Sequence, residues 1–95
     1  MKVVINRCYG GFGLSKLALD KLDKEYSHTI KRNDKNLVSV VEELQEKSNG
    51  GYADLKVVEI PNNHYWYIEE YDGIEWIVHS KDKIYHDSVE CEYFE

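Results

Sequence analysis

The sequence is poor in the residues that build cross-linked, disordered or membrane-spanning chains. Its 95 residues include one proline and two cysteines, Cys8 and Cys91, which stand near opposite ends and form no CxxC or Cys/His ligand spacing. The apolar start Val3-Val4-Ile5 meets a polar residue at Asn6, far short of a signal peptide or a transmembrane span. These absences predict a reduced, cytoplasmic protein that is ordered almost throughout and has no membrane partner.

Basic residues are also scarce. Lys and Arg number 12 against 18 Asp and Glu, which gives a formal net charge of -6, and the acidic residues crowd into the C-terminal half. Such a field repels phosphate backbones, and duplex binding usually leaves a basic stripe on the protein. We therefore expect no direct binding to nucleic acid. An acidic face is compatible with a plain solvated surface and with docking on a basic protein.

Motifs for catalysis and metal binding are missing as well. The four histidines have no metal-ligand spacing such as HExxH, and no Ser/His/Asp arrangement is indicated. Cys8 precedes a predicted helix and is a candidate nucleophile by position, but a phosphatase-like Cys-x5-Arg loop needs arginine where Leu14 stands. A structural thiol is the alternative. We expect no enzyme, no cofactor and no metal.

The sequence does contain the pattern of one small α+β domain, because 95 residues support a single core. The β-branched residues 3–5 predict a strand that is buried on both faces. Ser15 is placed to cap a helix over residues 16–26. Asp34 is placed to cap a second helix, whose apolar stripe runs to the Ser48-Asn49-Gly50-Gly51 segment.

The second half of the chain changes to a two-residue period. Residues 55–60, stopped by Pro61, predict a strand, and residues 64–71 and 74–79 flank Asp72-Gly73, a strong hairpin signal. Apolar residues beyond position 81 could dock as a last strand or tail. The order β-α-α-β-β-β predicts two helices packed on one face of a small, mostly antiparallel sheet, all within a single domain of residues 1–95.

The predicted hairpin is aromatic on both faces. With a two-residue turn, Trp66, Ile68 and Ile77 share one face. If the helices cover only that face, the other presents its aromatic residues to a partner subunit, the C-terminal tail or a flat ligand. The candidate interaction surface consists of Tyr65, Tyr67, Glu69, Glu70, Glu75 and Trp76.

The glycine-rich turn Cys8-Tyr9-Gly10-Gly11-Phe12-Gly13 joins the first strand to the first helix. Free backbone N–H groups at a helix start attract anions, and glycine lets the backbone approach closely. The candidate ligand-binding residues are Arg7, Tyr9, Gly10, Gly11, Phe12, Gly13, Ser15 and Lys16. The turn lacks the Gly-Lys-Ser/Thr of a P-loop and the third glycine of a dinucleotide fingerprint. Its alternative role is a sharp reversal under which Tyr9 and Phe12 pack.

Several stretches together resemble a group of small uncharacterised phage and prophage proteins. They are MKVVINRCYGGFGLS at residues 1–15, LVSVVEEL at 37–44, LKVVEIP at 55–61 and WYIEEYDG at 66–73. The resemblance covers most of the chain to about Val78. The C-terminal end, SVECEYFE, departs from the basic and aromatic tail of similar proteins, so no role of that tail is implied here.

The resemblance implies a phage protein in the host cytoplasm that acts by binding. One hypothesis is an anti-defence sponge, in which the glycine turn captures a nucleotide signal of host immunity. The alternative is an anti-CRISPR-like inhibitor, in which the acidic, aromatic hairpin docks on a basic host defence protein. The third is a structural accessory protein, whose mark is a stable homo-oligomer.

Overall fold

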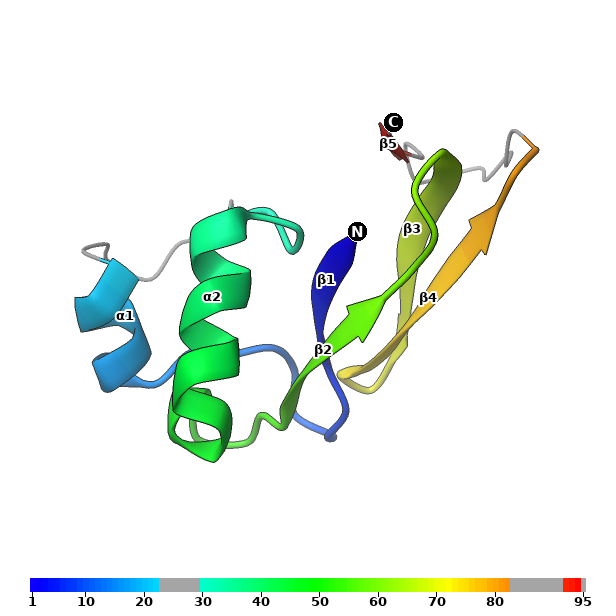
Figure 1. The fold of residues 1–95 in the computed structure, drawn as a ribbon. Coiled ribbons are helices and arrows are strands. Elements are labelled where there is room, and N and C mark those ends of the chain that lie inside the picture. Colours follow the sequence, from blue (N-terminus) through cyan, green and yellow to red (C-terminus); the bar gives the residue numbers. More distant parts are fainter. Residues whose placement is uncertain (23–29, 83–91, 95) are drawn as a thin grey trace.

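The middle of the molecule is a two-stranded ribbon that separates the helices from a β-hairpin. The computed structural model describes residues 1–22, 30–82 and 92–94. The ribbon pairs β1 (Lys2–Asn6) with β2 (Leu55–Glu59) antiparallel, with Val4 opposite Val57. On one side lie α1 (Lys16–Leu22), α2 (Lys35–Leu44) and the 3-10 helix η1 (Gln45–Ser48). On the other lie β3 (His64–Tyr71) and β4 (Ile74–Ser80), with the short β5 (Glu92–Phe94) paired to β3 (Figure 1).

The ribbon is buried on both faces, as its run of β-branched residues predicts. Val4 and Leu55 pack with the helices in a cluster that includes Ala18, Leu37 and Val41. The neighbouring Val3 and Ile5 point the other way and pack with Ile60 and Trp66. Since successive side chains of a strand alternate between faces, a strand between two layers needs apolar residues at consecutive positions.

Both predicted helix caps are confirmed. The Ser15 hydroxyl accepts the backbone N–H of Ala18 at 3.1 Å, and the Asp34 carboxylate accepts those of Asn36 and Leu37 at 2.9 and 3.0 Å. Each cap satisfies N–H groups that have no partner inside their own helix. The predicted first helix continues beyond Leu22 into residues 23–26, which lie outside the described residues.

The hairpin has the predicted register. Tyr71 lies opposite Ile74, Glu69 opposite Trp76, and Trp66 opposite His79. Asp72 and Gly73 both take positive φ angles, 49° and 93°, as a tight two-residue hairpin turn requires. Trp66, Ile68 and Ile77 therefore face the ribbon, where they pack on Val3 and Ile5.

The predicted α+β class is confirmed, but the strands form two antiparallel sheets in place of the single predicted sheet. Strands β1 and β2 make one sheet, and strands β4, β3 and β5, in that order, make the other. The second edge of β1 is already occupied: the N–H of Val4 donates to the Arg32 carbonyl at 2.8 Å, and that of Asn6 donates to Glu75 Oε1 at 2.8 Å. Because this edge has no room for another strand, the hairpin packs face to face on the ribbon.

A buried ion pair closes that edge. Glu75 is 6% exposed, and both its carboxylate oxygens accept hydrogen bonds from Arg32, whose guanidinium also stacks on Phe12 at 3.7 Å from the ring centroid. The sequence-based assignment of Glu75 to an interaction surface is therefore wrong. Its carboxylate is turned inward by the alternation of β4, toward Arg32 and the β1 backbone.

Among the described residues no helix is long and apolar enough to cross a membrane.

Replacing Glu75→Ala should lower the free energy of unfolding by about 3 kcal/mol, because it leaves Arg32 and the Asn6 N–H without their buried acceptor. Urea unfolding followed by circular dichroism measures the change. Glu59→Ala, which removes an exposed strand carboxylate, is the control and should stay within about 0.5 kcal/mol of the parent. Equal losses in the two variants would show that the ion pair does not hold the layers together.

Candidate functional site

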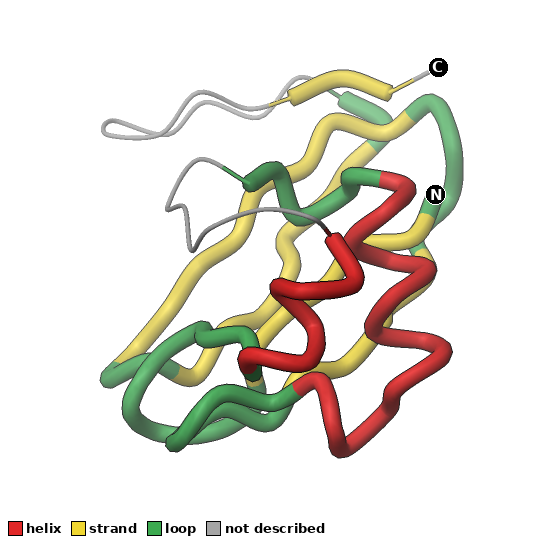
Figure 2. Tube along the Cα trace, turned by 90° about the vertical axis from the view of Figure 1, so that its left-hand side faces the viewer, coloured by secondary structure: helices red, strands yellow, loops and turns green. Residues whose placement is uncertain are grey.

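Three loops meet at the end of the molecule opposite the N-terminus. They are the glycine turn, the loop between η1 and β2, and the hairpin turn (Figures 1 and 2). The N–H of Gly10 donates to the Asp72 carbonyl at 3.1 Å, and the N–H of Gly50 donates to the Gly13 carbonyl at 2.9 Å. The glycine turn is thus clamped between the other two loops.

The close approach of these loops explains why glycine is needed. A Cβ on Gly73 would lie 2.8 Å from both Gly10 N and Gly11 Cα. A Cβ on Gly10 would lie 2.7 Å from the Cβ of Tyr52. Gly10, Gly11 and Gly73 also have positive φ angles, which side chains disfavour. The turn is therefore a sharp reversal, and Phe12 packs on the core beneath it, but Tyr9 is 62% exposed and does not pack there as the sequence-based alternative proposed.

The hollow beside the glycine turn is poorly suited to a phosphate. It has a volume of about 610 Å³ and is lined by Tyr9, Gly10, Gly11, Glu70, Asp72 and Gly73. Two carboxylates at its wall repel an anion. The N–H of Gly10 already has an acceptor, and the Ser15 hydroxyl donates to the Lys47 carbonyl at 2.6 Å. Phe12 lies under Arg32 instead of facing this hollow.

The side chain of Arg7 lies on a different surface from the glycine turn. Its Nη1 donates to the Glu75 carbonyl at 2.6 Å, and its side chain lines a hollow of about 410 Å³ between β2 and β4. The residues that share this Arg7–Trp76 hollow are Ile5, Arg7, Lys56, Val58, Glu59, Ile60, Trp76, Ile77 and His79. The structure therefore brings Arg7 together with Trp76 and separates it from Tyr9, Gly10 and Gly11.

The Arg7–Trp76 hollow combines an apolar floor with a basic rim. Ile5 and Ile60 are buried beneath it, and Arg7 and Lys56 stand exposed at its edge beside a single carboxylate, Glu59. Trp76 is 38% exposed, and its Nε1 donates to Glu69 Oε2 at 3.1 Å, which fixes the ring. Trp76 lines the hollow from β4, although its side chain points to the hairpin face opposite Ile77. An apolar floor with two cations at its edge and an aromatic residue beside it can hold a flat ligand that carries negative charge.

The remaining residues of the predicted interaction surface differ in exposure. Tyr67 is buried, with its hydroxyl donating to Glu69 Oε1 at 3.1 Å, and Tyr65 is half-buried. Glu70 is exposed near the hairpin turn. Of the six predicted surface residues, only Glu70 and Trp76 are exposed.

Lys56 and His79 also line the hollow, and Tyr52 borders the glycine turn, although none of these three residues was predicted from the sequence. The alternation of residues 55–60 places Lys56 on the face of Val58 and Ile60. The alternation does not show that this face of β2 lies near Trp76, because the distance between them depends on how the two sheets pack. Tyr52 stands in a loop without periodicity and carries no local signal.

No metal centre is formed within residues 1–22, 30–82 and 92–94, where no group of three or more His, Cys, Asp or Glu residues converges. His64 and His79 approach each other, with their Nδ1 atoms 2.9 Å apart. The Cys8 thiol is free and half-buried, and the backbone carbonyl of Cys8 accepts a hydrogen bond from Asn6 Nδ2.

Comparison of the chain with protein-family models, with curated proteins and with solved structures found no match.

The contact between the two glycine-containing turns can be separated from backbone strain with a matched pair of variants. Gly73 and Gly11 have similar φ angles, 93° and 97°, but a Cβ at Gly11 would meet nothing within 4 Å. Gly11→Ala should cost about 1 kcal/mol of unfolding free energy from strain alone, and Gly73→Ala at least about 1 kcal/mol more from overlap with the glycine turn. Thermal or urea unfolding measures both, and similar losses would argue against the close packing of the loops.

Proposed function

We propose that the protein is a small binding protein that captures an anionic ligand with a flat ring, of the nucleotide class, in the Arg7–Trp76 hollow. The observation that supports this proposal is the grouping of Arg7, Lys56 and His79 around an exposed Trp76 in a chain of net charge -6. A local basic rim in an acidic protein concentrates an anion at one place on the surface.

The chemistry of the hollow matches the parts of such a ligand. The guanidinium of Arg7 and the ammonium of Lys56 supply charge-assisted hydrogen bonds to phosphate oxygens. The Trp76 ring supplies a stacking surface, and base stacking on an aromatic side chain contributes about 1–3 kcal/mol. The volume of about 410 Å³ lies within the usual range for small-molecule sites.

The glycine turn contributes indirectly, by fixing the end of β1 from which Arg7 projects. Asn6 is fully buried, and its Nδ2 donates to the carbonyls of Cys8 and Gly73, both at 2.7 Å. Its Oδ1 accepts the N–H of Asp54 at 2.8 Å. These bonds set the position of the next residue, Arg7, relative to β4. In the phage setting implied by the sequence resemblance, the captured ligand is a nucleotide signal of host immunity.

A thermal-shift screen against linear, cyclic and ADP-ribose-type nucleotides tests the proposal. A ligand at 100 times its dissociation constant adds about 2.7 kcal/mol of stability, which for a chain of this size raises Tm by about 10 °C or more. Arg7→Ala and Lys56→Ala should each weaken binding at least about tenfold, because each removes a charge-assisted contact. Lys16→Ala is the matched control, since Lys16 is an exposed cation outside the hollow, and should leave affinity unchanged.

Tryptophan fluorescence locates the ligand independently. The chain has two tryptophans, and Trp66 is buried among Val3, Ile5 and Ile60. Quenching by a bound base should therefore disappear in Trp76→Phe and persist in Trp66→Phe. A flat result across the nucleotide panel would contradict the proposal. Loss of binding in Lys16→Ala, with Lys56→Ala unaffected, would return the ligand to the glycine turn.

A second candidate function is docking on a basic host protein. The surface that favours it lies where the glycine turn, the loop between η1 and β2 and the hairpin turn meet, and is called the loop end below. Tyr9, Tyr52 and Tyr71 are 62%, 81% and 68% exposed there, near the carboxylates of Glu70 and Asp72. Tyrosine is enriched at protein interfaces, and the carboxylates complement a basic partner.

Reversing both loop-end charges, Glu70→Lys with Asp72→Lys, tests this second function. Affinity capture from a bacterial lysate should recover a partner with the parent protein and lose it with this variant, because lysines oppose a basic surface. The control reverses two exposed helix carboxylates, Asp20→Lys with Glu43→Lys, and should retain the partner. Equal recovery by the loop-end variant would contradict docking through this surface.

A further inference from the structure

We propose that the outer edge of β2, in the groove between β2 and α2, binds an extended basic segment of another protein as an added antiparallel strand. This groove shares Lys56 with the Arg7–Trp76 hollow but lies on the other side of β2, and the proposal does not depend on nucleotide binding. It rests on three observations: unpaired backbone groups along β2, a groove beside them, and the charge of that groove.

The backbone of β2 has an open edge. Arg7 N donates to the Asp54 carbonyl and Ile60 N donates to the Met1 carbonyl, so the even-numbered residues of β2 turn their backbone groups toward β1. The odd-numbered residues turn theirs away. Leu55 N–H donates to Asn49 Oδ1 at 2.8 Å. Within the described part of the chain, the N–H and C=O groups of Val57 and Glu59 have no hydrogen-bond partner.

This edge differs from the second edge of β1. There, the Arg32 carbonyl and the Glu75 carboxylate accept the outward N–H groups of Val4 and Asn6. Nothing comparable covers Val57 and Glu59 among the described residues. An open strand edge is a template for pairing with another chain, and many domains bind extended peptides in this way.

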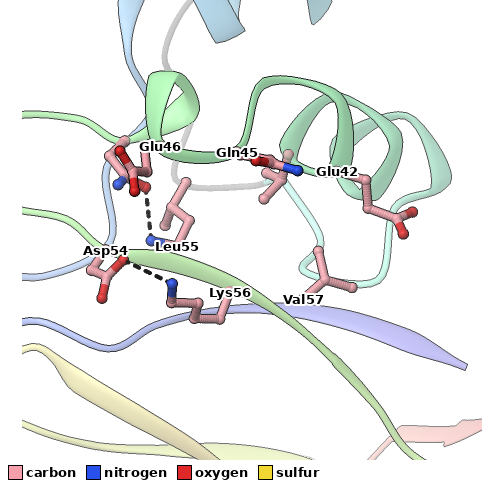
Figure 3. Close-up of a pocket in the computed structure, with 9 residues that line it drawn as sticks. Glu42, Gln45, Glu46, Asp54, Leu55, Lys56 and Val57 are labelled. Atoms are coloured by element: carbon pink, nitrogen blue, oxygen red, sulfur yellow. Dashed lines mark hydrogen bonds and ion pairs between the residues drawn. The ribbon is translucent and has the colours of Figure 1, made fainter.

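A groove of about 370 Å³ runs beside the open edge (Figure 3). Glu42, Gln45 and Glu46 lie on its helical side, and residues 54–57 run along its strand side. Val41 and Val57 supply apolar contact surface within it. An added strand would therefore gain side-chain contacts as well as backbone hydrogen bonds.

The charge of the groove selects a basic occupant. Its wall carries the carboxylates of Glu42, Glu46 and Asp54 and the ammonium of Lys56, which lies 3.5 Å from Asp54 Oδ1. Glu42 accepts a hydrogen bond from Lys2 at 2.9 Å, and that bond raises the pKa of Lys2. The Glu46 carboxylate forms neither a hydrogen bond nor an ion pair with any described residue. A residue paired with Val57 shares its face, toward α2, so arginine or lysine there reaches Glu46.

The same charge disfavours a second copy of this chain as the occupant. Two copies paired edge to edge through β2 would bring two acidic grooves and two chains of net charge -6 together. Like charges at an interface cost affinity. A basic segment of a different protein meets no such repulsion.

The peptide acetyl-Arg-Val-Arg-Val-Arg-amide serves as the probe, because its arginines share one face when it is extended. In a ¹⁵N NMR titration of the full chain, it should shift the Val57 and Glu59 amides saturably. An antiparallel partner turns the N–H groups of its arginines toward β2, and those of its valines away. N-methylation of the central arginine should therefore abolish binding, and N-methylation of a valine should preserve it.

Paired variants test the charge of the groove. Glu46→Lys should weaken binding of the peptide at least about fivefold, whereas Glu43→Lys, the same change nearby on α2 at a residue paired with Lys21, should change it less than about twofold. Equal binding of acetyl-Glu-Val-Glu-Val-Glu-amide, or binding that tolerates N-methylation of the central arginine, would overturn the proposal. Concentration-dependent dimerisation that protects the Val57 and Glu59 amides would also overturn it, because the occupant would then be a second copy.

Discussion

The ion pair between Arg32 and the buried carboxylate of Glu75 is the interaction on which the arrangement of the layers depends. Glu75 belongs to the hairpin, Arg32 to the segment before α2, and the Asn6 N–H that Glu75 accepts belongs to the ribbon. One carboxylate thus connects all three layers and replaces the strand that would otherwise pair with β1. Burying a charge is costly unless its hydrogen bonds are complete, and here both carboxylate oxygens have donors.

This arrangement determines which surfaces remain for binding. One edge of β1 is closed by the Arg32 backbone carbonyl and the Glu75 carboxylate. The hairpin lies across the ribbon and leaves the Arg7–Trp76 hollow between β2 and β4. The hydrogen bond from Arg7 to the Glu75 carbonyl joins the rim of that hollow to the same residue. The glycine turn packs closely against Gly73 of the hairpin turn, and this contact helps to hold the hairpin in place on the ribbon. Its Gly10 N–H is taken by the Asp72 carbonyl, and in the proposed function its contribution is the placement of Arg7.

Much of the fold could be predicted from sequence because its signals are local. The caps at Ser15 and Asp34, and the register set by Asp72-Gly73, each depend on a few adjacent residues. The division into two sheets could not be predicted, since it depends on Arg32 meeting Glu75 across 43 positions. Glu75 looks like an ordinary exposed hairpin acid until that partner is known.

The candidate site was predictable only in part, for the same reason. Arg7 and Trp76 were singled out separately, one for charge and one as an aromatic residue, and their shared hollow depends on the crossing of two sheets. Lys56 and His79 join them by the same crossing. The glycine turn was the stronger local pattern, but the Gly10 N–H donates to the Asp72 carbonyl, and the space beside Gly10 is filled by Tyr52.

Native-state hydrogen exchange of four backbone amides tests the central claim, that the outer edge of β1 is closed and that of β2 is open. The account predicts that the Val4 and Asn6 amides exchange slowly, with opening free energies near that of global unfolding, because Arg32 and Glu75 accept their hydrogen bonds. It predicts rapid exchange for the Val57 and Glu59 amides. Equal protection at all four positions, or slower exchange at Val57 and Glu59, would contradict the account.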